Sequence, residues 1–130
     1  MAMIILIGRY LSNLNAIKDS VPDSLLPLCC CVEEKDLLRR MSGVFKQYAG
    51  LGVAILDVSS CPEGVNRALQ NFQNHCPKRV LKIVIHPYQG RLLNSLQARF
   101  ADMQFVHLED VTDQLAPLLT KIRSNTEVSF

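Results

Sequence analysis

The sequence predicts a three-layer, doubly wound α/β domain built around a five-stranded, mainly parallel sheet. Two observations predict it: five short apolar runs alternate with five segments of helical periodicity, and several of the runs are almost continuously apolar. Strands of a parallel sheet are covered by helices on both faces, so they lack the alternation of half-exposed strands. The predicted strands are residues 4–7, 28–32, 53–58, 80–85 and 104–108.

The segments after these runs carry apolar residues three or four positions apart, which is the spacing of one helical face. The second segment is the most regular, because its charged residues fall away from the apolar stripe. In chain order, the stripes are Tyr10 or Leu11 with Leu14 and Ile17; Leu37, Leu38, Met41, Val44, Phe45 and Tyr48; Val65, Ala68, Leu69 and Phe72; Leu92, Leu93, Leu96 and Phe100; and Leu115, Leu118, Leu119 and Ile122.

Pro117 interrupts the last of these stripes. A proline is harmless in the first turn of a helix, where its missing N–H donor is not needed, but it disrupts later turns. We therefore predict that the last helix begins at Asp113 or later, or that it bends.

The length of 130 residues fits one domain with one core, which we place at residues 1–123, followed by a flexible C-terminal tail at residues 124–130. Strands and helices that alternate five times are joined by right-handed crossovers, and the common result is the strand order 2-1-3-4-5. In that topology ligands bind at the carboxyl ends of the strands, near the point between the first and third strands where the order reverses.

The charge pattern does not favour a nucleic-acid partner. Fourteen Lys and Arg against twelve Asp and Glu give a formal net charge of +2, and no basic run is present. The first apolar run ends at Gly8, far short of the roughly 20 residues of a membrane span. The start of the chain also lacks the basic region and cleavage site of a secretion signal. We therefore expect a cytoplasmic protein with no membrane partner.

The five cysteines do not have the spacing of a disulfide framework or of a zinc site. Cys29, Cys30 and Cys31 are consecutive, while Cys61 and Cys76 stand alone. A zinc site requires paired Cys or Cys/His spacing, which is missing. We interpret these cysteines as small, mostly buried hydrophobic residues.

Polar residues follow the predicted strands, and we single out Arg9, Asp57, Ser59, His86 and Tyr88 as candidate binding residues. Asp57 closes the apolar run VAILDV, where a carboxylate needs either solvent or a partner. Arg9 follows the neighbouring first strand and is the predicted partner. Such an ion pair would keep Asp57 ionised and occupy the space of a metal ion.

No catalytic constellation is recognisable. His86 titrates near neutral pH, but Ser59 and Ser60 lack the G-x-S-x-G turn of a nucleophile, and Cys61 has no activating motif. The single Gly8 after the first strand forms neither the dinucleotide-binding nor the phosphate-loop motif. We therefore assign no catalytic residue, no metal ligand and no cofactor.

The order of elements, with ILDVSSCPEG after the third strand, resembles the receiver domain of two-component response regulators over about residues 3–123. Receivers carry a phosphate-accepting Asp at the end of that strand, followed by a loop with Pro and Gly. Asp57, Pro62 and Gly64 are similar to these residues. The resemblance implies a flavodoxin-like fold and a part in signal transduction.

The departures from the receiver pattern imply a pseudo-receiver. Receivers bind Mg²⁺ with an acidic pair after the first strand, where this chain has Gly8 and Arg9. Receivers place Ser or Thr after the fourth strand, where this chain has His86 and Pro87. They place Lys after the fifth strand, where this chain has the residues 107–109, His-Leu-Glu. Phosphoryl transfer requires a metal and a cation to offset negative charge, so Asp57 should not accept phosphate efficiently.

The leading hypothesis is a non-catalytic, receiver-like domain that regulates through contacts with a protein partner, with a homodimer as one form. The resemblance implies a contact surface on the last two helices and the strand between them. In this chain the surface would expose Gln97, Arg99, Gln114, Lys121 and Arg123.

Two alternatives stay open from the sequence. One is a small α/β enzyme or ligand-binding domain that takes a nucleotide or another phosphorylated small molecule at the strand ends, through His86, Tyr88 and Asp57. The other is a structural subunit of an assembly, which would expose a broad apolar patch.

Overall fold

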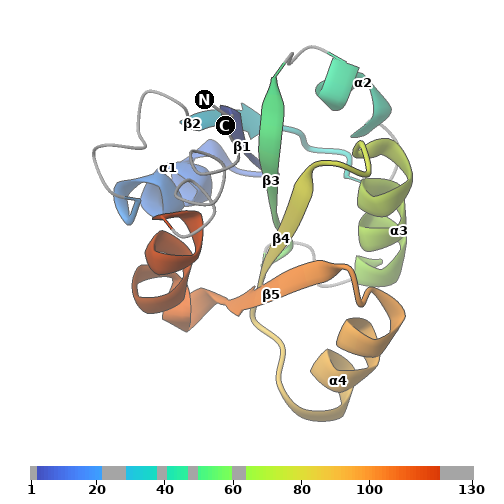
Figure 1. Ribbon diagram of the computed structural model, residues 1–130. Coiled ribbons are helices and arrows are strands. Elements are labelled where there is room, and N and C mark those ends of the chain that lie inside the picture. Colours follow the sequence, from blue (N-terminus) through green and yellow to red (C-terminus); the bar gives the residue numbers. More distant parts are fainter. Residues whose placement is uncertain (1–2, 22–28, 38–40, 47–49, 60–63, 121–130) are drawn as a thin grey trace.

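The computed structural model describes residues 3–21, 29–37, 41–46, 50–59 and 64–120. Figure 1 shows a central sheet with helices on both sides. The elements are β1 (Met3–Gly8), α1 (Leu11–Asp19), β2 (Cys29–Glu33), α2 (Met41–Lys46), β3 (Leu51–Asp57), α3 (Val65–His75), β4 (Leu81–His86), α4 (Gly90–Arg99), β5 (Met103–His107), the 3₁₀ turn η2 (Leu108–Asp110) and the π-helical turn η3 (Val111–Leu115).

The strands form one sheet in the order β2-β1-β3-β4-β5, and each neighbouring pair is parallel. This confirms the predicted strand order and the doubly wound α/β class. The observed strands differ from the predicted ones by one or two residues at each end. The predicted tail, residues 124–130, lies outside the described residues.

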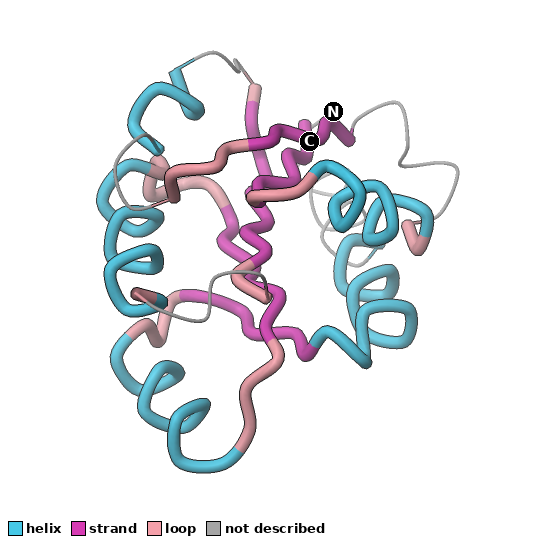
Figure 2. Tube along the Cα trace, turned by 180° about the vertical axis from the view of Figure 1, so that it is seen from behind, coloured by secondary structure: helices cyan, strands magenta, loops and turns pink. Residues whose placement is uncertain are grey.

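Helices lie on both faces of the sheet, as Figures 1 and 2 show from opposite sides, and each face has its own hydrophobic core. α1 and the C-terminal segment, which we define as residues 108–120, cover one face, hereafter the α1 face. α2, α3 and α4 contribute to the core on the other, hereafter the α3 face. The α1-face core is Ile4, Leu6, Leu14, Ile17, Val21, Cys29, Val53, Ile55, Ile83, Ile85, Val106, Val111, Leu115 and Leu119. The buried α3-face residues include Ile5, Ile7, Met41, Phe45, Ala54, Leu56, Leu69, Phe72, Val84 and Leu96.

The second helix lies within the apolar stripe that predicts it. α2 spans six residues, and Leu37, although buried, precedes it. Met41, Val44 and Phe45 are buried as predicted. The predicted stripe members Leu38 and Tyr48 lie outside the described residues.

The prediction that the fourth apolar stripe faces the core is wrong for its first residue. Leu92 was expected to face the core but is 46% exposed, whereas Leu96 and Phe100 are buried. α4 lies beyond β5 at the lower end of Figure 1, and its second half makes its contact with the core. The periodicity therefore identified the helix but not how much of it the sheet covers.

The C-terminal segment begins earlier than predicted and is irregular where it precedes Pro117. Helical turns start at Leu108, the π-helical turn η3 ends at Leu115, and residues 116–120 are α-helical. Pro117 has no N–H to donate to the carbonyl of Asp113, so a regular α-helix would leave that acceptor without its partner. A π-helical turn next to a proline is a recognised irregularity of helices, and it changes the hydrogen-bond pattern just before Pro117.

Candidate functional site

Asp57, at the end of β3, is held by its own turn. The backbone N–H of Ser59 donates to Asp57 Oδ1 at 2.9 Å, and the Ser59 hydroxyl donates to the same oxygen at 2.6 Å. Asp57 Oδ2 receives no hydrogen bond from the described residues. Because Asp57 is 1% exposed, this turn fixes a buried carboxylate at the carboxyl edge of the sheet.

Gly8, at the end of β1, packs directly against this carboxylate. A Cβ atom at Gly8 would lie 2.8 Å from Leu14 Cδ2 and 3.3 Å from Asp57 Cβ. Leu14 is fully buried, so it has little room to move away. The β1 position that faces Asp57 therefore has no space for a side chain, acidic or otherwise.

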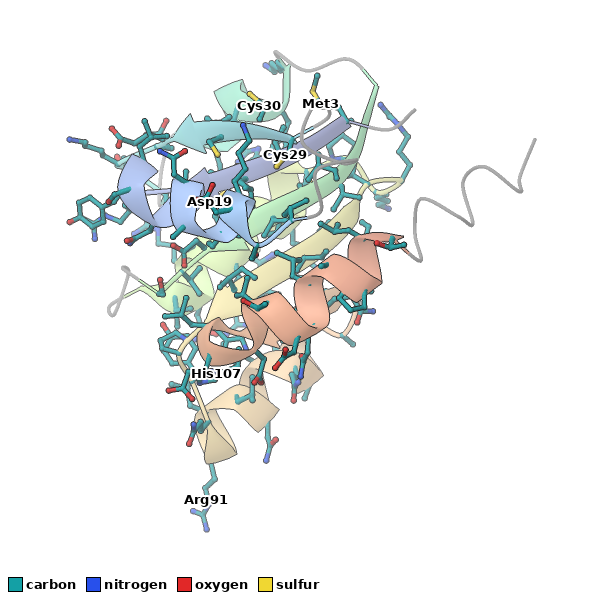
Figure 3. The ribbon with its side chains drawn as sticks, turned by 90° about the vertical axis from the view of Figure 1, so that its left-hand side faces the viewer. Met3, Asp19, Cys29, Cys30, Arg91 and His107 are labelled. Atoms are coloured by element: carbon teal, nitrogen blue, oxygen red, sulfur yellow. The ribbon has the colours of Figure 1, made fainter. Side chains whose placement is uncertain are left out.

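A hollow of about 290 Å³ opens beside Asp57, between α1 and the C-terminal segment. Figure 3 views this side of the molecule, with Asp19 on α1 and His107 where the C-terminal segment begins. Asp57 is the one charged residue among the described residues that line the hollow. They are Asn13, Ala16, Ile17, Ser20, Asp57, Ser59, Leu108, Val111 and Thr112.

The ion pair predicted between Arg9 and Asp57 is not formed. The guanidinium of Arg9 lies 5.8 Å from the ring centroid of Tyr10. The salt bridge within the described residues joins Lys82 Nζ to Asp102 Oδ2 at 3.8 Å. The turn with Ser59 therefore takes the place of the predicted partner for Asp57.

His86, at the end of β4, lies on the α3 face in an aromatic cluster. It stacks on Tyr88 with ring centroids 5.9 Å apart and meets Phe105 and His107 edge to face at 5.8 and 5.4 Å. His86 and His107 are paired in register at the ends of β4 and β5. The cluster thus follows directly from the parallel register of these two strands.

Both imidazoles use Nδ1 as an acceptor. The Tyr88 N–H donates to His86 Nδ1 at 3.0 Å, and the Glu109 N–H donates to His107 Nδ1 at 3.1 Å. A neutral ring that accepts at Nδ1 carries its proton on Nε2 and cannot use that nitrogen as a metal ligand. His107 Nε2 is buried and has no hydrogen-bond partner in the described part of the chain.

Burial lowers the pKa of His86 below its ordinary value, and the nearby His107 lowers it further, while the hydrogen bond from Tyr88 raises it. The ring is 1% exposed, so its charged form would lose most of its hydration. Neutral His86 is therefore the favoured form in the folded protein. No nucleophile lies among its described contacts, so the geometry gives it no catalytic partner.

The candidate residues do not form one site. Asp57 follows Val53 and Ile55 on the α1 face, whereas His86 follows Val84 on the α3 face, with Tyr88 packed beside it. Sequence analysis placed these residues at the same edge but could not separate the two faces. It also did not select His107, although the positions of the two histidines at adjacent strand ends were the available signal.

The buried cysteines have the character of core residues. Burial raises the pKa of Cys29 and of Cys76 to about 11, and it also raises the pKa of Cys31. Such thiols stay protonated at neutral pH and are poor nucleophiles or metal ligands. Cys61 lies outside the described residues.

Two further searches concern the described residues only. They contain no cluster of three or more His, Cys, Asp or Glu side chains arranged to hold a metal ion. They also contain no helix with the length and apolar character needed to cross a membrane.

Comparison with known proteins gives a likeness in fold. No protein-family model matches the chain. No curated protein matches it. Among solved structures, the chain is similar to the Legionella pneumophila response regulator LqsR, with a TM-score of 0.57 and 9% sequence identity. The match covers 95% of this chain and 43% of the LqsR chain, so this chain spans less than half the length of that protein. The likeness shows a receiver-like, flavodoxin-like fold.

Proposed function

We propose that this chain is a receiver-like regulatory domain that acts by contact with another protein and does not accept a phosphoryl group. The similarity in fold to LqsR supports the regulatory role. The contact that we propose is with a second copy of this chain, through α4 and the C-terminal segment.

The packing around Asp57 supports the absence of phosphoryl transfer. A phosphoryl group on a carboxylate needs a metal ion and nearby cations to offset its charge. Gly8 has no space for an acidic side chain, and Asp57 Oδ1 already accepts two hydrogen bonds from Ser59. Among the described residues, none that lines the hollow beside Asp57 is a cation.

The exposure of α4 carries the proposal of a protein contact. Within this ten-residue helix Leu96 is the buried residue, and Leu92 leaves 46% of its surface exposed. A helix that buries so little of its own surface gains stability from a partner that covers Leu92. The predicted contact residues Gln97, Arg99 and Gln114 are exposed, while Lys121 and Arg123 lie outside the described residues.

The charges on this surface suit a second copy of the same chain. Arg91 and Arg99 are exposed on α4, and Glu109 and Asp113 are exposed on the C-terminal segment. In a two-fold interface each patch meets its equivalent, so α4 of one copy can face the C-terminal segment of the other. Figure 3 shows Arg91 projecting from the end of α4.

Sedimentation at a series of concentrations tests this contact. We expect the wild-type chain to dimerise and Leu92→Ser to weaken the dimer by about tenfold or more, because each copy would bury one Leu92 side chain. Leu11→Ser is the matched control, since Leu11 is 44% exposed on α1, which is not part of the proposed contact. A wild-type chain that stays monomeric, or a dimer that Leu92→Ser leaves unchanged, would contradict the proposed contact.

The alternative of a phosphorylated ligand at the strand ends is less favoured by charge. The described hollow at that edge has Asp57 as its charged lining residue, and a phosphate would be repelled by it. His86 and Tyr88, which the alternative also requires, lie on the other face of the sheet.

A further inference from the structure

The hollow beside Asp57 has the size and walls of a small-ligand site. Its volume of about 290 Å³ lies at the lower end of the roughly 300 to 1,000 Å³ that is typical of small-ligand pockets. The α1 residues in its wall recur at helical spacing from Asn13 to Ser20, and they therefore lie along one side of α1. Seven residues of helix span about 10 Å, so the hollow extends along α1.

Asp57 places a buried negative charge in the wall of this hollow. The carboxylate is 1% exposed, and its two described hydrogen bonds both end on Oδ1. A carboxylate can accept about four hydrogen bonds, and a buried charge is costly unless it is paired. Oδ2 receives no donor from the described residues, and Asp57 lines the hollow, so a ligand with a positive charge and N–H donors would complete the environment of this carboxylate.

A divalent metal ion suits this site poorly. Mg²⁺ requires a near-octahedral set of oxygen ligands, and the described lining residues supply one carboxylate. An ammonium group has one charge and three donors, which matches Asp57 together with the neutral side-chain oxygens of Asn13 and Thr112. Ile17 and Val111 provide apolar walls for an attached hydrocarbon chain.

We propose that this hollow binds a protonated aliphatic amine, with its ammonium group at Asp57 and its hydrocarbon chain between Ile17 and Val111. A free small amine and a lysine side chain of another protein share this chemistry. The site does not rest on the proposed dimer, because its lining residues come from α1, the end of β3 and the C-terminal segment of one copy, and none of them belongs to α4.

Calorimetry and amide NMR shifts of the full chain, titrated with n-butylammonium chloride, test the proposal. We expect saturable binding with shifts at Ser59 and Thr112. Asp57→Asn should weaken binding by about tenfold or more, because it removes a charge-assisted hydrogen bond. Asp113→Asn is the matched control, since it removes an exposed carboxylate that does not line the hollow, and it should leave the affinity unchanged.

Ala16→Leu provides a second test that leaves the turn of Asp57 and Ser59 intact. The larger side chain should occupy the hollow and weaken n-butylammonium binding while the carboxylate stays in place. This variant keeps the proposal testable if Asp57→Asn disturbs folding. Unchanged binding by Ala16→Leu would contradict the assigned position of the amine.

Related probes separate the ligand classes. Butyrate and 1-butanol should not bind, since one has the wrong charge and the other has none. Binding of Nα-acetyl-lysine methylamide as well as n-butylammonium supports a lysine side chain as the source, and binding of n-butylammonium alone supports a free amine. Absence of saturable amine binding, equal binding by Asp57→Asn, equal binding of butyrate, or displacement of the amine by Mg²⁺ would overturn the proposal.

Discussion

Asp57 and Gly8 show how one missing side chain changes what a neighbouring residue can do. Gly8 allows β1 to approach the end of β3, and Leu14 then fills the space that a side chain at position 8 would need. The result is a carboxylate bounded by hydrocarbon and by its own turn. The sequence indicated the missing acidic residue, but the packing of Leu14 required the three-dimensional structure.

We predict that Gly8→Ala lowers the free energy of unfolding by about 1 to 3 kcal/mol, because the new methyl group would overlap the buried Leu14. Urea denaturation measures the change. Gly43→Ala is the matched control: a Cβ there meets nothing within 4 Å, and the position lies inside α2, so we expect stabilisation by about 0.5 to 1 kcal/mol. The cost of Gly8→Ala should be smaller in a Leu14→Ala background, and equal costs would contradict the proposed overlap.

His86 should make the stability of the fold depend on pH. Its pKa is lower in the folded protein than the unfolded value of about 6.5, so its contribution is complete above that value and is lost as the pH falls below it. We predict that the melting temperature falls between about pH 7.5 and about pH 5, and that His86→Phe reduces this fall. His75→Gln, at an exposed histidine of α3, is the control. An equal fall in wild type and His86→Phe would refute this assignment.

Among the elements, β4 contains a buried cation that its sequence alone does not explain. Lys82 is 5% exposed within the strand LKIVIH, and its ammonium group lies 3.8 Å from Asp102 in the turn before β5. Asp102 also accepts a hydrogen bond from Gln73 of α3 at 3.2 Å. These contacts connect α3, β4 and the start of β5 at the amino ends of the strands.

We predict that Asp102→Asn lowers the free energy of unfolding by about 1 to 3 kcal/mol, because it leaves the buried Lys82 ammonium without its carboxylate. Lys82→Met removes the buried charge itself and should cost less than Asp102→Asn or stabilise the protein. Thermal or urea denaturation of both variants decides the comparison. If Lys82→Met lowered the free energy of unfolding more than Asp102→Asn does, the prediction would be wrong. The charged Lys82 would then stabilise the fold more than a buried hydrocarbon side chain at the same position.

The elements also show which parts of the fold the sequence could predict. The apolar runs located the five strands to within a residue or two, because buried parallel strands are continuously apolar. The stripe predicted for α3 is confirmed throughout, because Val65, Ala68, Leu69 and Phe72 are all buried. α4 was harder to predict. The apolar periodicity identifies a helix, but the exposure of Leu92 depends on where the sheet ends, and the periodicity carries no information on that.

For the whole molecule, the strand order was predictable from the sequence. The sequence did not show which polar residues at the strand ends lie on the α1 face and which lie on the α3 face. Five alternations of strand and helix restrict the order to few possibilities, and the observed order β2-β1-β3-β4-β5 is the predicted one. Whether a strand-end residue faces α1 or α3 depends on register to a single residue. A shift of one position would have brought Asp57 and His86 to the same face.

The receiver-like fold therefore carries two separate polar features, a carboxylate in a hollow on the α1 face and an imidazole pair on the α3 face. Within the part of the chain that the structure describes, neither feature has the metal ligands and cations that phosphoryl transfer needs. This combination is the basis for proposing a domain that works through binding.

The most direct measurement is the intact mass of the full chain after incubation with acetyl phosphate and Mg²⁺. We predict no added phosphoryl group on the wild-type chain, and a mass change identical to that of Asp57→Asn under the same conditions. A receiver with a complete acidic pocket serves as the positive control for the reagent. A phosphoryl adduct that appears on the wild-type chain, depends on Mg²⁺ and is lost in Asp57→Asn would contradict the account.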